Sequence, residues 1–436
     1  MKRIASFSLL FIPLFLLLHP SRANAQDEYL RYTDFTYLDN IFSVKFHVEG
    51  LLLTMPIIEL GSSTRLVLTF DDIDGDVKDY TFTFVHCDAN WQPSNLPEME
   101  YLEGFPGERI RQFNFSFKTL WPYTHYTLPL PNQDLRWLVS GNYLLKIYDD
   151  TNKQLAITRR FVVVDSKVSI RPEVLRAAQV NKFRTHQEID FVVEHPRLNI
   201  RNPMQEVRAT IIQNGRWDNA IIGVEPKFIR PNTLIFDYQD RVVFPGLREF
   251  RFLDLRSLRL VSFNIASVQR TDNGFVVQLK RDLPRSRQAY TTFEDINGNF
   301  LLATTDQEDN NLSGEYLETY FALEAEEPFP GREVYIFGGF TEWQMKPEFR
   351  MEYDAEAKAY LGGALLKQGY YDYMYAATPA EWDKPKKGGG DPEADLAFIE
   401  GSSFEAENEY TIIMYYRPYG SRFDQVVGVL SFSSEL

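Results

Sequence analysis

Cysteine and histidine are scarce in this chain. Its 436 residues include one cysteine, Cys87, and six histidines, and no two histidines stand in an HxH or HxxxH pair. One cysteine cannot form an internal disulfide, and a zinc site needs three or four Cys, His or carboxylate ligands. We therefore expect no disulfide, no metal and no other cofactor, so burial of a hydrophobic core must hold the fold together.

Positive charge is also in short supply. Lys and Arg total 46 against 61 Asp and Glu, which gives a formal net charge of −15. This balance argues against nucleic acid and against anionic membrane surfaces as partners. No apolar run of about 18 residues follows residue 25, so direct membrane insertion by a helix is not expected. The GxSxG and P-loop motifs are absent too, and we expect neither an enzyme nor a small-molecule ligand.

The N-terminus has the pattern of a secretory signal. Lys2 and Arg3 precede the apolar run "SLLFIPLFLLL", and the small residues "ANA" stand directly before Gln26. A positive start, a short apolar centre and small residues at the cleavage point define such signals. We expect residues 1–25 to be removed and the mature chain to lie in the periplasm.

Alternation of apolar and polar residues dominates the rest of the chain. In "RLVLTFDDIDGDVKDYTFTFVHC" every second residue of two successive runs is apolar, with an acidic turn between them. Further turns are predicted at Asn273-Gly274 and Asn297-Gly298, because Asn-Gly between strand-like runs is a strong hairpin signal. Many short strands joined by turns predict an all-β fold of packed, Ig-like β-sandwiches.

Changes of composition suggest where these sandwiches begin and end. We place boundaries near Asp165 and Glu326, which gives three consecutive β-sandwich domains at residues 26–165, 166–326 and 327–436. The segment "KPKKGGGDPE", residues 384–393, combines charge, Gly and Pro and is predicted to be a long loop.

The stretch "FVHCDANWQPSNLP", residues 84–97, raises the question of a reaction centre. Cys87 could act as a nucleophile with His86, or with His125 if the fold brings it near. Neighbouring residues on a strand point to opposite faces, which separates His86 from Cys87. We expect Cys87 to be a packed, apolar thiol instead.

The acidic segment "DDIDGD", residues 71–76, resembles a calcium loop at first sight. An EF-hand spacing that starts at Asp72 requires Gly at position 77 and Glu at position 83. Val77 and Thr83 stand there instead, so we interpret the segment as a turn between strands.

Two motifs near the end of the chain, "VYIFGGFTEWQ" and "GYYDYMYAA", resemble the Ig-like glycogen- and starch-binding modules. In those modules two tryptophans stack on the glucan, and Trp343 and Trp382 fall at roughly the matching places. An exposed aromatic face can hold a sugar ring. A periplasmic glycan-binding protein that uses this pair is therefore our alternative hypothesis.

A set of motifs in order along the mature chain resembles one family, the plug protein of the type IX secretion system of Bacteroidetes. The motifs are "HCDANWQPSNLPEMEYLEGF", "YTHYTLPLPN", "SGNYLLKIYDD", "ITRRFVVVD", "REFRFLDLRSL", "GEYLETYFAL", "VYIFGGFTEWQ", "GYYDYMYA" and "EGSSFEAENEYTIIMYYRPYGSR". The resemblance implies a subunit that docks on the periplasmic mouth of the system's large outer-membrane barrel. It would close the pore when no cargo passes, and it would be held at the outer membrane through that partner. The family supplies no catalytic residues.

Partner binding is assigned to the loop that follows Cys87. Interface hot spots favour Trp, Tyr and Arg, and loops on rigid sheets carry function. The candidate partner-binding residues are Asp88, Asn90, Trp91, Tyr101 and Phe105.

Overall fold

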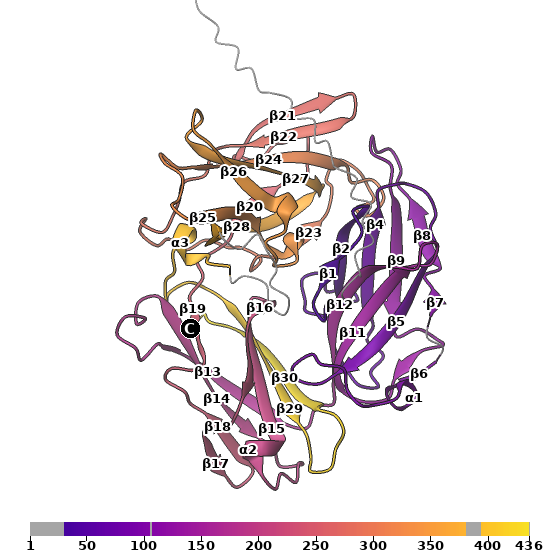
Figure 1. Ribbon diagram of the computed structural model, residues 1–436, viewed down its shortest axis with the longest axis vertical. Coiled ribbons are helices and arrows are strands. Elements are labelled where there is room, and N and C mark those ends of the chain that lie inside the picture. The colour runs from indigo at the N-terminus through magenta and orange to yellow at the C-terminus, as the bar shows by residue number, and fades with distance from the viewer. Residues whose placement is uncertain (1–29, 105–106, 381–393, 436) are drawn as a thin grey trace, which may run out of the picture. The chain divides into compact units, whose positions relative to one another are not determined.

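A computed structural model describes residues 30–104, 107–380 and 394–435 (Figure 1). The predicted signal at residues 1–25 and the predicted loop at residues 384–393 lie outside these ranges. The described chain is all-β, and its α-helices have four residues each: α1 (Glu98–Tyr101), α2 (Pro203–Glu206) and α3 (Ala397–Glu400). Within the described ranges, no helix is long and apolar enough to cross a membrane.

Two sheets enclose the first hydrophobic core. One sheet has the order β1-β12-β11-β5-β7 with β3 beside β12, the other has the order β2-β4-β9-β8, and β10 and β6 form a separate pair. Their bounds are β1 (Phe35–Thr36), β2 (Ile41–Val48), β3 (Ile57–Glu59), β4 (Leu66–Asp72), β5 (Tyr80–Cys87), β6 (Leu102–Glu103), β7 (Glu108–Arg109), β8 (Gln112–Phe115), β9 (Thr124–Leu130), β10 (Arg136–Trp137), β11 (Gly141–Asp149) and β12 (Gln154–Val164).

The predicted alternation is what fills this first core. Every second residue of β4 and of β5 is buried, beginning with Leu66 and with Tyr80. The rings of Phe70 and Tyr126 stack at 5.0 Å between the strands, and Tyr80 meets both rings edge-on. Period-two patterning thus specifies which face of each strand enters the sandwich.

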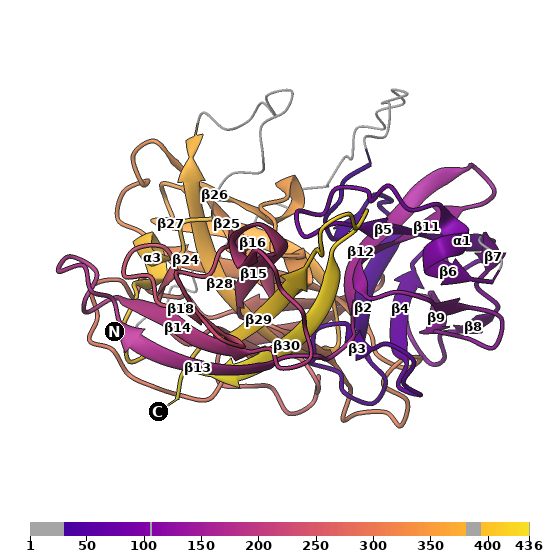
Figure 2. The same cartoon turned by 90° about the horizontal axis from the view of Figure 1, so that it is seen from below.

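A second core lies between two further sheets, of order β13-β14-β18-β17 with β19 beside β14, and β16-β15-β29-β30. Their bounds are β13 (Ser169–Arg176), β14 (His186–Glu194), β15 (Val207–Gln213), β16 (Arg216–Val224), β17 (Phe228–Arg230), β18 (Thr233–Phe236), β19 (Val243–Pro245), β29 (Glu409–Tyr416) and β30 (Gln425–Ser433). Figure 2 shows β29 and β30, in yellow, beside the magenta strands of this group.

The third core is built on one nine-stranded sheet of order β20-β28-β25-β26-β27-β24-β22-β21, with β23 beside β28. The bounds are β20 (Arg251–Asp254), β21 (Ile265–Thr271), β22 (Gly274–Leu279), β23 (Phe300–Leu302), β24 (Tyr316–Glu324), β25 (Arg332–Phe337), β26 (Arg350–Asp354), β27 (Ala359–Lys367) and β28 (Gly369–Pro379), with 3-10 turns η1 (Gly339–Thr341) and η2 (Pro347–Phe349).

The expected boundary near Glu326 falls inside one sheet instead of between two domains. The three parts of the fold are also not consecutive in sequence. β24, before that boundary, pairs along its whole length with β27, after it. The last two strands, β29 and β30, do not belong to the nine-stranded sheet. β29 pairs instead with β15, from Val207–Tyr416 to Gln213–Tyr410. In the sequence, the nine-stranded sheet is thus inserted between two parts of the second sandwich. The prolines and acids before residue 332 mark the loop between β24 and β25, and local composition carries no signal for strand pairing across about 200 residues.

The two Asn-Gly turns have different outcomes. The first prediction finds the hairpin from β21 to β22 but places its turn one residue late, since Asp272 and Asn273 form the turn and Thr271 lies opposite Gly274. At the second, Asn297 and Gly298 both have positive φ, but no strand is described directly before the turn. A Cβ on Gly298 would lie 2.2 Å from the Trp343 ring, so this glycine permits a close approach as well as a turn.

The inserted topology predicts how a core substitution in β29 spreads. Ile412 is fully buried opposite Ile211 of β15. We expect Ile412→Ala to lower the free energy of unfolding by about 2–5 kcal/mol and to expose residues 207–245 to protease. Guanidinium unfolding and limited proteolysis measure both effects, with Leu361→Ala, at a partly exposed site, as the milder control. Cleavage confined to residues 327–436 would contradict the topology.

Candidate functional site

The loop after β5 is shaped by Asp88. One carboxylate oxygen accepts the backbone N–H groups of Asn90 and Gln92, each at 2.9 Å. Its carbonyl accepts the Asn142 side chain at 3.0 Å, and Trp91 takes a positive φ of 60°. An aspartate that bonds its own backbone two residues on fixes a tight turn. This turn directs Trp91 away from the strand that it follows.

Trp91 is buried inside the chain, with 2% of its surface exposed. Its ring meets Trp217 of β16 edge-on at 5.0 Å, and the Arg160 guanidinium lies over both rings, at 4.5 and 5.3 Å. Burial lowers the pKa of Arg160 to about 10. A desolvated cation over indole faces is strongly attracted to them. The loop therefore joins the first sandwich to the second.

The other expected partner residues divide between buried and exposed positions. Tyr101 is buried and donates its hydroxyl to the Phe84 carbonyl at 3.2 Å, whereas Asn90 is exposed. Phe105 lies outside the described residues. The predicted recognition stretch is thus mainly an internal joint, because Trp91 and Tyr101 are committed to contacts within the chain.

His86 and Cys87 are both buried and do not form a reactive pair. His86 Nδ1 is 2.9 Å from the Ser94 hydroxyl, and burial lowers the pKa of His86 to about 4. Burial, together with the neighbouring charge of Asp88, raises the pKa of the Cys87 thiol to about 12. A thiol held protonated at neutral pH is a poor nucleophile. The other possible base, His125, lies on β9 in the opposite sheet and is held by Asp71.

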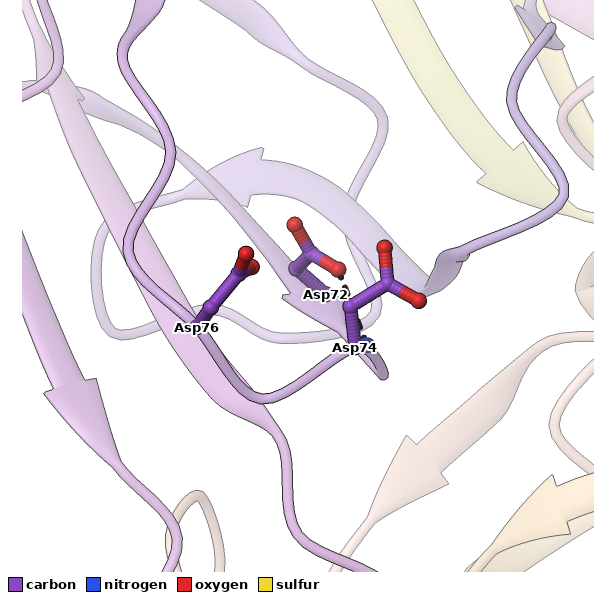
Figure 3. A group of neighbouring side chains, drawn as sticks. All are labelled: Asp72, Asp74 and Asp76. Carbon is purple, nitrogen blue, oxygen red and sulfur yellow. Dashed lines mark hydrogen bonds between the residues drawn. The ribbon is translucent and has the colours of Figure 1, made fainter.

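Figure 3 shows the acidic turn, where carboxylate oxygens of Asp72, Asp74 and Asp76 lie within 4.8 Å of one another. The Lys78 ammonium lies among them, with Nζ at 2.8, 2.6 and 3.0 Å from the three carboxylates in that order. Partial burial opposes the charge of Lys78, but these three bonds outweigh it and raise its pKa. The lysine side chain supplies the positive charge that a metal ion would bring to the turn.

Asp71, beside that turn, is the centre of a buried polar cluster. Its oxygens lie 2.6 Å from Lys367 Nζ on β27 and 2.6 Å from His125 Nδ1, and the Tyr316 hydroxyl of β24 donates at 2.8 Å. Lys367 also donates to the Asn311 carbonyl at 2.6 Å. Burial opposes the Asp71 charge, yet the lysine and the histidine hold the pKa of Asp71 below its usual value. The cluster joins the first sandwich to the nine-stranded sheet.

Glu342, in the turn after β25, forms a second joint of the same kind. Its carboxylate accepts a hydrogen bond from Arg159 of β12, the Thr36 backbone N–H at 3.1 Å, and the Lys346 ammonium at 2.6 Å. Although the carboxylate is buried, Arg159 and Lys346 lower the pKa of Glu342. The motif that suggested a sugar-binding turn thus holds two sheets together. No local pattern in the sequence identifies this role of Glu342.

Trp343 follows directly and is partly buried. Its ring packs at 5.9 Å from Phe250 and 5.6 Å from Phe337, with the Arg216 guanidinium at 5.4 Å. Trp382 lies outside the described residues. The Trp343 and Trp382 pair expected for glycan binding therefore stays a prediction, and the contacts of Trp343 are those of a packed side chain.

Comparison with known proteins adds a family to this geometry. Residues 41–165 match the family described as type 9 secretion system plug protein 1st domain. The chain carries a plug first domain. A crystal structure of a hypothetical protein from Parabacteroides merdae is 29% identical, covers 93% of this chain and 100% of its own, and has a TM-score of 0.86. No curated protein matches the chain.

The plug first domain holds one side of each joint described above. Asp71, Trp91 and Arg159 all lie within residues 41–165, and their partners Lys367, Trp217 and Glu342 lie beyond residue 165. The similarity to the solved structure extends over nearly the whole chain, so the domain and its partners belong to one shared fold.

The protonated, buried state of Cys87 predicts a chemically inert thiol. We expect no alkylation by iodoacetamide at pH 8 in the native state, because the thiolate forms only near pH 12. Unfolding in guanidinium should give full labelling. The chain has one cysteine, so mass spectrometry reads the result directly. Rapid labelling of native protein would contradict this prediction and would reopen a catalytic role.

The buried Asp71–Lys367 ion pair predicts a large loss of stability when one of its two side chains is removed. Asp71→Ala leaves an uncompensated buried ammonium, so we expect the free energy of unfolding to fall by about 3–5 kcal/mol. The double change Asp71→Ala with Lys367→Met should cost less than the sum of the single changes. Chemical denaturation measures this cycle. As a control, Lys358→Ala removes the exposed ion pair with Glu326 and should have a much smaller effect.

Proposed function

We propose that this protein is a periplasmic plug subunit of the type IX secretion system. It docks on the periplasmic mouth of the system's outer-membrane barrel and closes the pore when no cargo passes. The observation that carries the proposal is the match of residues 41–165 to the plug first domain. The protein acts by occupying space and forming contacts, and it catalyses no reaction.

The joints around the first domain support this role. A plug must resist deformation, because a barrel wide enough for folded cargo leaks wherever the plug yields. The Asp71 and Glu342 clusters place paired charges in buried positions, where separation of the sheets would leave charges without partners. Such joints favour a body that moves as a unit.

The chemistry of the chain is consistent with a non-enzymatic role. The one thiol is protonated and buried, His125 is paired with Asp71, and Lys78 pairs with all three carboxylates of the acidic turn. The export signal predicted for residues 1–25 supports a periplasmic location, and partner contacts would then hold the protein at the outer membrane.

Deletion of the gene tests the proposal. Loss of the plug should leave barrels open, so uptake of a large antibiotic such as vancomycin should rise at least several-fold. Wild-type protein and Lys358→Ala should both restore the barrier. A tagged wild-type chain should retrieve an outer-membrane barrel from solubilised membranes. Unchanged permeability together with no retrieved barrel would refute the proposal.

A further inference from the structure

The strand β8 is an unprotected edge of the first sandwich. It is the terminal strand of its sheet, and among the described strands it pairs only with β9 (Figures 1 and 2). All four of its residues are exposed. Phe115 and Phe117, two residues apart, are 55% and 61% exposed, and Phe113, earlier on β8, extends the same apolar strip. One side of β8 therefore presents backbone groups and phenyl rings to the surroundings.

The composition around β8 is opposite to that of the whole chain. Residues 109–118 read "RIRQFNFSFK", with three basic residues and no acidic one, in a chain with a net charge of −15. Arg109 pairs with Asp79 at 3.0 Å, whereas Arg111 is exposed and the Lys118 ammonium lies 5.1 Å from the centre of the Phe117 ring. The exposed edge is thus aromatic along its length and basic at both ends.

Edges of this kind are normally protected. Soluble proteins blunt an exposed edge with inward charges, prolines, bulges or a covering segment, because a bare edge pairs with other chains. β8 has no proline and no charged residue among its four positions. Its charges lie only at the ends, where they would select a partner without blocking strand addition.

We propose that β8 is the docking strand for an extended segment of the partner barrel, which adds to the edge of the sheet and carries acidic and apolar side chains. Backbone bonds would provide binding energy, and side chains would provide register. Acidic groups of the segment would meet Arg111 and Lys118, and apolar groups would lie on Phe115 and Phe117. The inference rests on the proposed function, because it takes the barrel as the partner.

A second copy of this chain fits the edge less well. If two β8 strands paired, each copy would bring its own Arg111 and Lys118 to an edge that carries the same positive charges. Like charges opposite each other destabilise a strand pair. The charge pattern therefore favours a different, acidic chain over self-association.

The test uses the full-length tagged chain in the bacterium that encodes it. The double variant Phe115→Glu with Phe117→Glu places negative charge on the strip at exposed positions. We expect it to retrieve at least tenfold less barrel than wild type from solubilised membranes. The matched control is Phe228→Glu, since Phe228 is 50% exposed on the terminal strand β17 of another sheet. This control should retrieve as much barrel as wild type.

Photocrosslinking provides a readout that does not depend on the stability of these variants. A photoreactive phenylalanine analogue at the exposed position Gln112 should crosslink to the barrel, and one at Phe228 should not. Crosslinks at Gln112 to a second copy of this chain or to lipid would overturn the inference, as would undiminished retrieval by the double variant. If the wild-type protein itself retrieves no barrel, the result refutes the proposed function. It does not then test whether β8 is the docking strand.

Discussion

The buried ion pair between Asp71 and Lys367 is the contact on which the arrangement of the sheets depends. Both side chains are almost completely shielded from water, so each charge loses its hydration when the sheets meet. The loss is offset only if the partner atoms are close and the remaining hydrogen-bonding capacity is used. His125 and Tyr316 bond the carboxylate as well, and the Asn311 carbonyl accepts a second hydrogen bond from Lys367. The pair therefore tolerates little displacement of the first sandwich relative to the nine-stranded sheet.

The other two joints follow a related principle with different chemistry. Glu342 gathers Arg159, Lys346 and Thr36 around one carboxylate, whereas Trp91 and Trp217 share the cation of Arg160. Apolar contact alone permits sliding, because it is non-directional. Hydrogen-bonded charges and a cation over aromatic faces specify angle and register as well as proximity. Together the joints give the molecule a defined outline, which an occluding protein requires.

The sequence predicts local structure well because local structure depends on neighbouring residues. The burial of alternate residues in β4 and β5 and the turn before Gly274 follow from period and turn chemistry. The pairing of β29 with β15 cannot be predicted in this way. β29 is a central strand buried on both faces, and such a sequence does not specify which strand lies beside it. For this reason the expected cut near Glu326 divided one sheet and missed the return of the chain to the second sandwich.

The same distinction between local and long-range contacts explains why the loop predicted to bind a partner mainly contacts the rest of its own chain. Trp91 has the residue type and loop position of an interface hot spot, and it does lie at an interface, but that interface is inside the chain. The residue type predicts that Trp91 makes a contact, but it does not identify the partner in that contact. Exposure in the folded state resolves this, since a phenylalanine on a terminal strand that stays exposed leaves apolar surface that the described chain does not cover. In this fold the internal joints are built from charges and tryptophans, whereas the bare edge is built from phenylalanines and backbone. Docking through the edge would therefore use none of the side chains that form the joints, so the protein could bind and release its partner without rearranging its own sheets.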